Sequence, residues 1–311
     1  MLNVSNIEFS YLKEITIFRS NFNLEIGKNL AIIGESGCGK STLLKLIYGM
    51  YDLDKGTIFW DKKEVLGPKY TLIPEMDFIK YLAQDFDLMP FITVAENIGK
   101  YLSNVDLDKK QQRILELLEV VEMTEYANVK PKYLSGGQMQ RVAIARVLAL
   151  EPELLLLDEP FSHIDNFRKN ALRRKLFDYF KKKNITTVIA THDSTDVLSF
   201  ADEVLIMKDG KIIEKGIPKE IYNSPKSFYV ASLFGDVNEI SFDFFDMELK
   251  QNLILYPHQL KIVAHSKLKV TVNKSYYRGN YYLIESSYKK GTIFFENKTD
   301  LKVNKEVYLS N

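Results

Sequence analysis

The nine residues from Gly34 to Thr42 constrain this chain more than any other stretch. Their sequence, Gly-Glu-Ser-Gly-Cys-Gly-Lys-Ser-Thr, fits the phosphate-binding loop pattern G-x-x-x-x-G-K-[ST]. The apolar run 30–33 predicts a buried strand before the loop, and the apolar spacing of residues 42–48 predicts a helix after it. The glycines let backbone N–H groups point at phosphate oxygens, and the helix N-terminus adds partial positive charge. The stretch therefore predicts a nucleotide-binding α/β fold.

Two side chains of this loop carry specific chemistry. Lys40 would reach the β- and γ-phosphates, and the Ser41 hydroxyl would hold Mg²⁺. Cys38 lies at the predicted helix N-terminus next to Lys40, which predicts a reactive thiolate that bound nucleotide protects. We assign nucleotide binding to the whole loop: Gly34, Glu35, Ser36, Gly37, Cys38, Gly39, Lys40, Ser41 and Thr42.

Composition excludes few classes of protein. The net charge of +1 gives no overall field that would attract nucleic acid or membrane. Residues 240–311 hold 11 basic and 7 acidic side chains, a net +4, which indicates either a solvated surface or a functional one. The single cysteine allows no internal disulfide and fits a reducing cytosol. No apolar run reaches the length that crosses a bilayer, so a membrane role would need another chain.

A second candidate anion site follows at Ser135, Gly136 and Gly137, where a long apolar helix is expected to begin. Serine is a good N-cap, so these residues are explained by capping alone. The exposed N–H groups of a helix start also bind phosphate, which is the second interpretation.

Two carboxyl groups follow a fully apolar run at residues 154–157, which predicts a central parallel strand. Ligands of open α/β sheets bind beyond the carboxyl ends of strands. Asp158 would then hold Mg²⁺, and Glu159 would act as general base towards a water molecule. The alternative is an acidic pair that caps a helix.

Two further positions are candidates by location, and one predicted strand ends on a polar amide. His192 is the last residue of the predicted strand 187–192, which should neighbour the Asp158 strand; the alternative to catalysis is a structural histidine. Gln84 ends a predicted strand at residues 79–84. Tyr11 follows the first predicted strand and would either stack on adenine or be a half-exposed turn aromatic.

The remaining pattern outlines the fold. Separate strands are predicted at residues 4–9, 15–18 and 22–26, a helical region at about 93–127, and a hairpin around Lys208-Asp209-Gly210. Beyond residue 235, short alternating runs predict a small all-β barrel of the oligonucleotide/oligosaccharide-binding type.

Taken in order, these motifs resemble the ATP-binding subunits of ABC transporters over residues 1 to about 235. Residues 34–41 match the Walker A loop, Gln84 the Q-loop glutamine, and residues 134–138 the signature. Residues 154–159 match Walker B, and His192 matches the switch histidine. Tyr11 matches the adenine-stacking aromatic, and residues 162–165 match the D-loop, with His163 where a small residue is usual.

The resemblance implies the fold and the domains. The fold class expected is an α/β P-loop NTPase of ABC type, with a mixed sheet core in 1–235 and a helical subdomain at about 86–148. Residues 240–311 resemble the TOBE (OB-like) barrel of ATPase subunits that serve importers of sugars, polyamines, iron, sulfate or molybdate. This tail is shorter than the two-barrel tails of many members.

The resemblance also implies the activity. Two such domains sandwich two Mg-ATP molecules head to tail, each between the Walker A loop of one chain and Ser135–Gly137 of the other. Lys40, Ser41, Gln84 and Asp158 would place phosphates and Mg²⁺, Glu159 would polarise the attacking water, and His192 would contact the γ-phosphate. Gln138 and Asp165 complete the expected nucleotide contacts.

The implied partners are transmembrane permease subunits, a second ATPase chain of the same or another kind, and an external solute-binding protein reached through the permease. No nucleic acid is expected, and the expected location is peripheral, on the cytoplasmic face of the cell membrane. Two alternatives stay open. One is an exporter or lipid-extraction ATPase; the other is a soluble ABC ATPase acting on nucleic acid or ribosomes, which the basic barrel permits.

Overall fold

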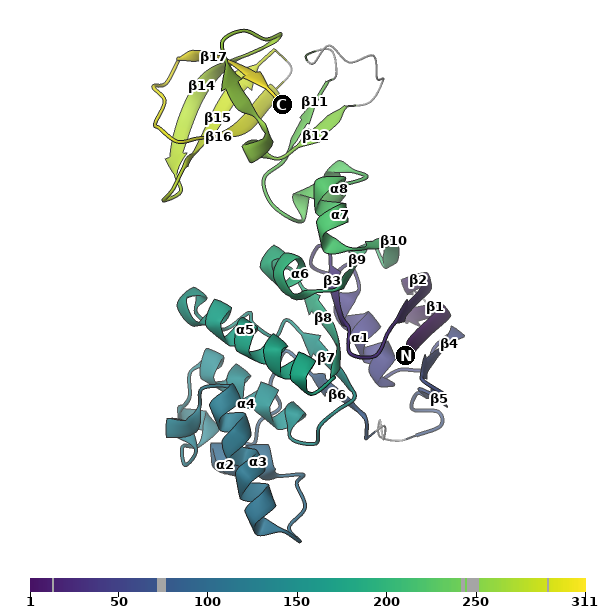
Figure 1. The fold of residues 1–311 in the computed structure, drawn as a ribbon. Helices are drawn as coiled ribbons and strands as arrows, with labels where there is room; N and C mark the ends of the chain where they lie inside the picture. Colours follow the sequence, from purple (N-terminus) through teal and green to yellow (C-terminus); the bar gives the residue numbers. More distant parts are fainter. Residues whose placement is uncertain (13, 72–76, 242–243, 245–251, 290) are drawn as a thin grey trace. The chain divides into compact units, whose positions relative to one another are not determined.

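The structure is a computed structural model that describes residues 1–12, 14–71, 77–241, 244, 252–289 and 291–311 (Figure 1). The described chain divides into two compact units, Met1–Pro218 and Lys219–Asn311. The boundary expected from the sequence lies later, between 235 and 240. Residues between the two positions contact the second unit: Tyr222 stacks on Tyr256 with ring centroids 4.4 Å apart. The domain limits drawn from the sequence stay a prediction.

The first unit contains ten described strands and six complete helices besides two short 3₁₀ turns. Its strands are β1 Leu2–Tyr11, β2 Glu14–Leu24, β3 Asn29–Ile33, β4 Lys55–Trp60, β5 Lys63–Glu64, β6 Ile79–Leu82, β7 Leu154–Asp158, β8 Thr186–Thr191, β9 Glu203–Lys208 and β10 Lys211–Gly216. Its helices are α1 Lys40–Tyr48, α2 Val94–Gly99, α3 Leu107–Val120, α4 Gly136–Leu148, α5 Asn166–Lys182 and α6 Ser194–Phe200, with 3₁₀ turns η1 Thr124–Tyr126 and η2 Pro131–Tyr133.

The main sheet has the strand order β10-β9-β3-β8-β7-β6 within the described residues. Its neighbours are parallel except β10, which pairs antiparallel with β9. The central strand β7 is buried along its whole length, as the apolar run predicts. Leu154 and Leu156 pack into the core around α1, whereas Leu155 and Leu157 pack into the core around α4 and α5. One strand therefore holds two hydrophobic cores together.

Helix α1 lies between the main sheet and a second, antiparallel sheet of order β2-β1-β4-β5. The prediction of two strands at 15–18 and 22–26 is wrong, because β2 runs unbroken through the polar residues between them. These polar groups are satisfied within the ladder: the Ser20 hydroxyl donates to the Phe18 carbonyl, and the Asn21 side chain accepts from the Asn6 amide. Register shifts in β1 absorb the irregularity.

The helical region predicted at 93–127 is two helices and a 3₁₀ turn. Thr93 caps α2 through a reciprocal bond with Glu96, and Asp106 caps α3 by accepting from the Lys109 amide. Each cap satisfies N–H groups that a helix start leaves unpaired. The region therefore forms two separate helices, and α3 starts at residue 107 with its own cap.

The second unit is a small β structure that follows two short helices. Its helices are α7 Pro218–Asn223, which begins at the boundary, and α8 Phe228–Ser232, and its strands are β11 Asn238–Ile240, β12 Leu253–Leu255, β13 Lys261–Val263, β14 Leu268–Tyr277, β15 Tyr282–Tyr288, β16 Gly291–Asn297 and β17 Glu306–Ser310, with a 3₁₀ turn η4 Pro257–Gln259. The antiparallel sheet β13-β17-β14-β15-β16 covers an apolar core that includes Val270, Ile284 and Phe295. This antiparallel half-barrel agrees with the OB-like prediction.

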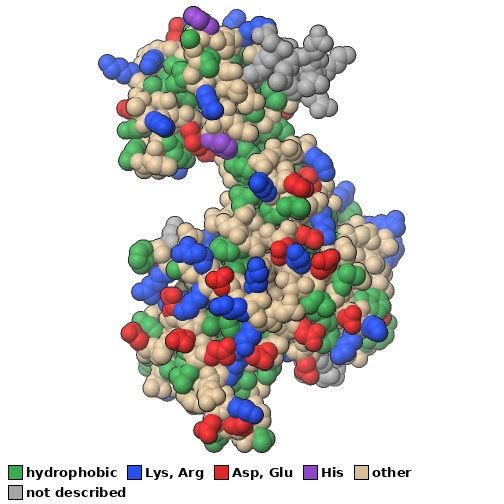
Figure 2. All heavy atoms as spheres, viewed as in Figure 1, with side chains coloured by type: hydrophobic (Ala, Val, Ile, Leu, Met, Phe, Trp, Pro, Cys, Tyr) green, Lys and Arg blue, Asp and Glu red, His purple; other side chains and the backbone are tan. Residues whose placement is uncertain are grey.

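Charged side chains of both signs are interspersed over the face of the first unit seen in Figure 2. This distribution agrees with the net charge of +1. Among the helices that the structure describes, none is long and apolar enough to span a bilayer.

The two-sided packing of β7 makes a prediction about stability. Leu155→Ala should lower the free energy of unfolding of the first unit by about 2–5 kcal/mol, because it leaves a cavity in a closed core. Leu115, 46% exposed on α3, provides the control, and Leu115→Ala should change it by less than about 1 kcal/mol. Urea unfolding followed by fluorescence of the buried Trp60 measures both, and equal effects would contradict the two-core packing.

Candidate functional site

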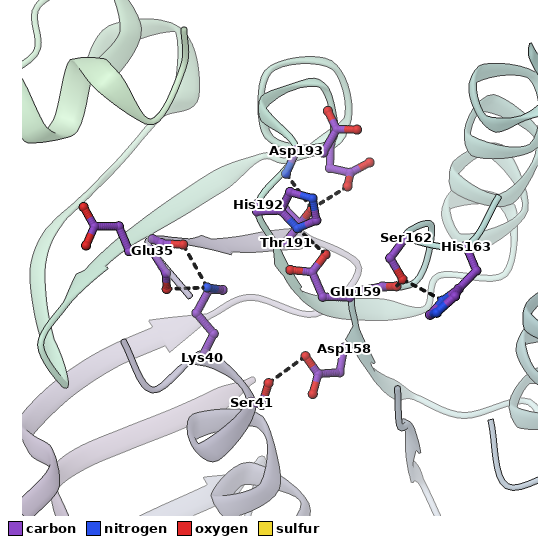
Figure 3. A network of polar contacts seen from close by, with 12 residues as sticks. Glu35, Lys40, Ser41, Asp158, Glu159, Ser162, His163, Thr191, His192 and Asp193 are labelled. Atoms are coloured by element: carbon purple, nitrogen blue, oxygen red, sulfur yellow. Dashed lines mark hydrogen bonds and ion pairs between the residues drawn. The ribbon is translucent and has the colours of Figure 1, made fainter. Parts of the chain in front are cut away.

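A cavity of about 360 Å³ lies at the carboxyl edge of the main sheet. It is lined by Thr16, Ser36, Gly37, Gly39, Lys40, Ser41, Thr42, Gln84, Glu159, Ser162 and His192. Residues that the sequence singled out in four separate segments therefore meet in one place. Figure 3 shows Lys40 and Ser41 from α1 facing Asp158, Glu159 and His192 from the ends of β7 and β8.

The loop before α1 surrounds the Lys40 ammonium group. Lys40 Nζ donates to the carbonyl oxygens of Gly34 and Glu35 at 2.8 and 2.9 Å, and its side chain is buried. Gly37 and Gly39 have φ angles of 82° and 105°, a region that side chains other than glycine rarely adopt. The ammonium is thereby fixed on the cavity side of a tightly curled loop.

Asp158 is a buried carboxyl group held by two hydroxyls. Its Oδ1 accepts from Ser41 Oγ at 2.9 Å, and its Oδ2 accepts from Tyr81 Oη at 3.1 Å. Among the described residues, no cationic side chain is paired with Asp158, although it is only 4% exposed. A buried carboxyl group without a cationic partner, beside a hydroxyl oxygen, matches the hard oxygen donors that Mg²⁺ takes.

No group of three or more His, Cys, Asp or Glu side chains that could hold a metal occurs in the described part of the chain. Mg²⁺ does not need such a cage, because it is usually bound by one or two carboxylates and the substrate phosphates. Asp158 and Ser41 fit this role. Gln84, exposed on the segment after β6, also lines the cavity.

Glu159 has a backbone conformation that is unusual for a residue with a side chain. Its φ is 50°, in the left-handed region. Its amide donates to Ala190 O at 2.9 Å, and its carbonyl accepts from Gln140 Nε2 at 2.8 Å and from Ser162 Oγ at 3.0 Å. These bonds hold the strained peptide, so the carboxyl group turns into the cavity instead of continuing the strand.

His192 contacts this carboxyl group directly. Its Nδ1 lies 2.8 Å from Glu159 Oε2. Because β8 pairs with β7 in parallel register, Asp158 opposite Ala190, the strand neighbourhood predicted for His192 is confirmed. The residue after it, Asp193, caps helix α6 and is ion-paired to Arg173 of α5, which fixes the start of α6.

Tyr11 lies at the end of β1 with its ring edge against Phe9 and Tyr51, at centroid distances of 4.7 and 5.5 Å. The pKa of Tyr11 is raised, mainly because the side chain is partly removed from water, and its hydroxyl interacts with the side chains of Tyr51 and Thr42. Thr42 lines the cavity, so Tyr11 is next to the site. Adenine stacking on it stays a prediction.

The candidate anion site at the start of α4 is not part of this cavity. Ser135 caps α4: its hydroxyl accepts from the Gln138 amide, and the Gln138 side chain accepts from the Ser135 amide. The capping interpretation is therefore confirmed, while phosphate binding stays a prediction. A separate cavity of about 270 Å³ is lined by Tyr126, Ser135, Gly137, Gln138, Arg141, Ile164, Asp165 and Arg168. Gly136 approaches the His163 side chain at the same helix start.

The structure corrects the prediction for Cys38. The thiol is only 6% exposed, and burial raises its pKa; the nearby Lys40 ammonium offsets this only in part. The helix start and the lysine are present as predicted, but desolvation outweighs them. A reactive thiolate is therefore not expected.

The sequence analysis missed two polar residues of this region. Tyr81 reaches Asp158, and Gln140, 1% exposed, bonds both Glu159 O and the His163 amide. The available signals were weak. Tyr81 is the aromatic residue in a short strand, and Gln140 is an amide in an otherwise apolar stretch of helix.

Fold and site together define a P-loop nucleoside triphosphatase: a mixed sheet with a phosphate loop, an Asp-Glu pair and a histidine at its carboxyl edge. Comparison with known proteins narrows this class. The family model described as ABC transporter matches residues 17–162. The chain belongs to the ABC transporter family and is one of its ATP-binding, ATP-hydrolysing subunits.

Two relatives illustrate the similarity. The chain is 42% identical over 241 residues to an Fe(3+) ions import ATP-binding protein, FbpC 1, of Rhodococcus jostii, covering 77% of this chain and 69% of the relative. It is 37% identical over 273 residues to a sulfate/thiosulfate import ATP-binding protein, CysA, of Mesostigma viride, covering 84% and 76%.

A solved structure gives the same result for the fold. The chain resembles the ATP-binding cassette MJ0796, a dimer in a post-hydrolysis state bound to ADP and phosphate. The TM-score is 0.63 at 30% identity, over 70% of this chain and 99% of the other. The fold class predicted from the sequence is confirmed.

The burial of Cys38 makes a prediction that a thiol reagent can check. Maleimide should modify the folded protein at least about tenfold more slowly than the guanidinium-unfolded protein, because the buried thiol is both inaccessible and poorly ionised. The chain has one cysteine, so intact-mass spectrometry follows that site alone. Equal rates, each corrected with a free thiol in the same buffer, would contradict the burial.

Proposed function

We propose that this chain hydrolyses Mg-ATP in a head-to-tail dimer and thereby powers solute import through separate transmembrane subunits. The observation that carries the proposal is the single cavity in which Lys40, Ser41, Gln84, Glu159 and His192 meet. A cation for phosphate, oxygen donors for a metal and a carboxylate for a water molecule are the parts that phosphoryl transfer requires.

The roles of the residues follow from their positions. On ATP binding, Lys40 would exchange its loop carbonyl partners for β- and γ-phosphate oxygens. Asp158, Ser41 and Gln84 would hold Mg²⁺, which neutralises charge that develops on the phosphate oxygens. Glu159 would accept a hydrogen bond from the attacking water, and His192 would hold that carboxyl group and contact the γ-phosphate. Catalysis would consist mainly of positioning and charge neutralisation.

The head-to-tail arrangement has support from the cavities of a single chain. Ser135 and Gly137 line a different cavity from the Lys40 loop, which supports a nucleotide held between two chains. A second chain would supply the missing half. The resemblance to a dimeric cassette supports the same arrangement.

Import is supported by the relatives, whose names describe import of iron ions and of sulfate or thiosulfate. Permease subunits, and an external solute-binding protein reached through them, are the partners we propose, at the cytoplasmic face of the cell membrane. Because ATPases of this similarity serve chemically different solutes, we assign the choice of solute to the other chains.

The base assignment can be tested by Glu159→Gln. ATP affinity should stay within about twofold, because the lost carboxylate faces the attacking water and does not bind ATP. Turnover should fall at least about 100-fold, because the general base acts in the transition state. Glu64→Gln, an exposed carboxyl group on β5, is the matched control and should change neither. Equilibrium nucleotide binding and phosphate release measure the two effects, and near-normal turnover of Glu159→Gln would remove it from the catalytic role.

The shared-site model can be tested by mixing two inactive variants. Lys40→Ala loses the phosphate-binding ammonium, and Ser135→Arg places a bulky side chain where phosphate should approach the α4 start. In a mixed dimer with shared sites, one site carries both defects and the other is intact. In a model where each chain uses its own residues, every site is broken.

The measurement is nucleotide trapped per mixed dimer, with Glu159→Gln in both chains to hold the closed state. We expect a value near one nucleotide per mixed dimer, against near zero for each variant alone. Chain exchange is confirmed with differently labelled chains. Trapping indistinguishable from zero after confirmed exchange would rule out the shared-site model.

A further inference from the structure

Tyr81 is a half-buried side chain that reaches the metal-site carboxyl group from β6. Its hydroxyl donates to Asp158 Oδ2 at 3.1 Å, while Ser41 Oγ from α1 donates to Oδ1 at 2.9 Å. The two oxygens of one carboxyl group are thus engaged from two different elements. We propose that Tyr81 is a specificity-determining residue that holds the Asp158 carboxyl group in one orientation and so favours Mg²⁺ over larger divalent cations.

The strand register explains how Tyr81 reaches this position. Strand β6 pairs in parallel with β7, with Tyr81 opposite Leu156. Side chains opposite each other in a sheet project to the same face, and Asp158 is two residues beyond Leu156 on that face. Tyr81 packs against the core under α1, together with Leu154 and Leu156. Its long side chain spans the remaining distance to the end of β7.

The tyrosine ring is itself held in place. Tyr48, at the end of α1, packs against it with ring centroids 5.5 Å apart. Tyr48 follows Ser41 by seven residues, about two helical turns, so both side chains project from the same face of α1. Helix α1 therefore supports this arrangement twice: Ser41 bonds Asp158, and the ring of Tyr48, which a phenylalanine would keep, packs on Tyr81.

The tyrosine remains a hydrogen-bond donor at any ordinary pH. The ordinary pKa of a tyrosine hydroxyl is about 10, so the hydroxyl keeps its proton and can donate to Oδ2 near neutral pH.

The selectivity follows from what a fixed carboxyl group offers a cation. Oδ1 accepts a hydrogen bond from Ser41 and keeps a lone pair for a cation, whereas a cation that took both oxygens would have to compete with the Tyr81 hydroxyl for Oδ2. Mg²⁺ demands a small and regular set of oxygen ligands and commonly uses few protein groups, whereas Ca²⁺ accepts flexible and bidentate carboxylates. Loss of the Tyr81 hydroxyl would free the carboxyl group to turn, which disfavours Mg²⁺ more than Ca²⁺. The inference rests on the proposed binding of Mg-ATP.

The test is Tyr81→Phe, which removes one oxygen atom and keeps the ring. The matched control is Tyr48→Phe, which removes a hydroxyl from the ring next to it; among the described contacts, that hydroxyl has no bond to Asp158. Binding of a non-hydrolysable ATP analogue, adenylyl imidodiphosphate, is measured with Mg²⁺, with Ca²⁺ and with EDTA. Thermal melting checks that each variant is folded.

We expect Tyr81→Phe to weaken the Mg²⁺-supported binding about tenfold, the lower end of the effect of losing a group that orients a metal ligand. Binding with Ca²⁺ should change less than about twofold, and binding in EDTA should be unchanged. Tyr48→Phe should resemble the unmodified protein. An unchanged ratio of Mg²⁺- to Ca²⁺-supported affinity in Tyr81→Phe would overturn the inference, and so would an equal loss in both variants.

The failure of the underlying function has a different signature. If the unmodified protein bound the analogue equally well with and without metal, the proposed Mg-ATP role itself would be wrong, and the inference with it. A metal-dependent unmodified protein with an unchanged Tyr81→Phe variant would refute the inference alone.

Discussion

The burial of β7 on both faces is the constraint on which the first unit depends. A strand between two hydrophobic cores has no solvent-facing side, so its residues must be apolar until it reaches an edge of the sheet. Carboxyl groups can therefore occur only where β7 leaves the core at its C-terminal end, at Asp158 and Glu159. The adjacent strand β8 ends at the same edge and brings His192 there. The position of the chemistry is thus a consequence of the packing of leucines.

The sequence was most informative where function needs a contiguous segment. The phosphate loop requires glycines at fixed offsets and a helix directly after them, so residues 34–42 predict both the local fold and its ligand. Strand ends were predictable for a similar reason, because a fully apolar run followed by polar residues marks where a buried strand leaves the core. These two rules located Lys40, Ser41, Asp158, Glu159 and His192.

The parts that escaped prediction depend on neighbours that are distant in sequence. Tyr81 reaches Asp158 only because β6 pairs next to β7 in one particular register. Gln140 matters because the start of α4 lies against the turn after β7. The error at β2 has the same origin: the polar residues 19–21 resemble a break until their partners on β1 are known. The predicted reactivity of Cys38 is wrong because the sequence shows the charged neighbour Lys40, whereas the burial that raises the pKa of the thiol depends on the whole core.

The left-handed backbone of Glu159 has a consequence for how such a protein can evolve. A side chain in this conformation costs about 1 kcal/mol relative to glycine, which adopts it freely. Selection for stability alone would replace the residue, and the replacement would cost the carboxyl group that faces the cavity. The hydrogen bonds that Gln140 and Ser162 donate to the Glu159 carbonyl, and the one that the Ala190 carbonyl accepts from its amide, offset the strain without removing it. Residue 159 is therefore a position where stability is permanently traded against activity, and where substitutions that strengthen the fold elsewhere would widen the margin for keeping the glutamate.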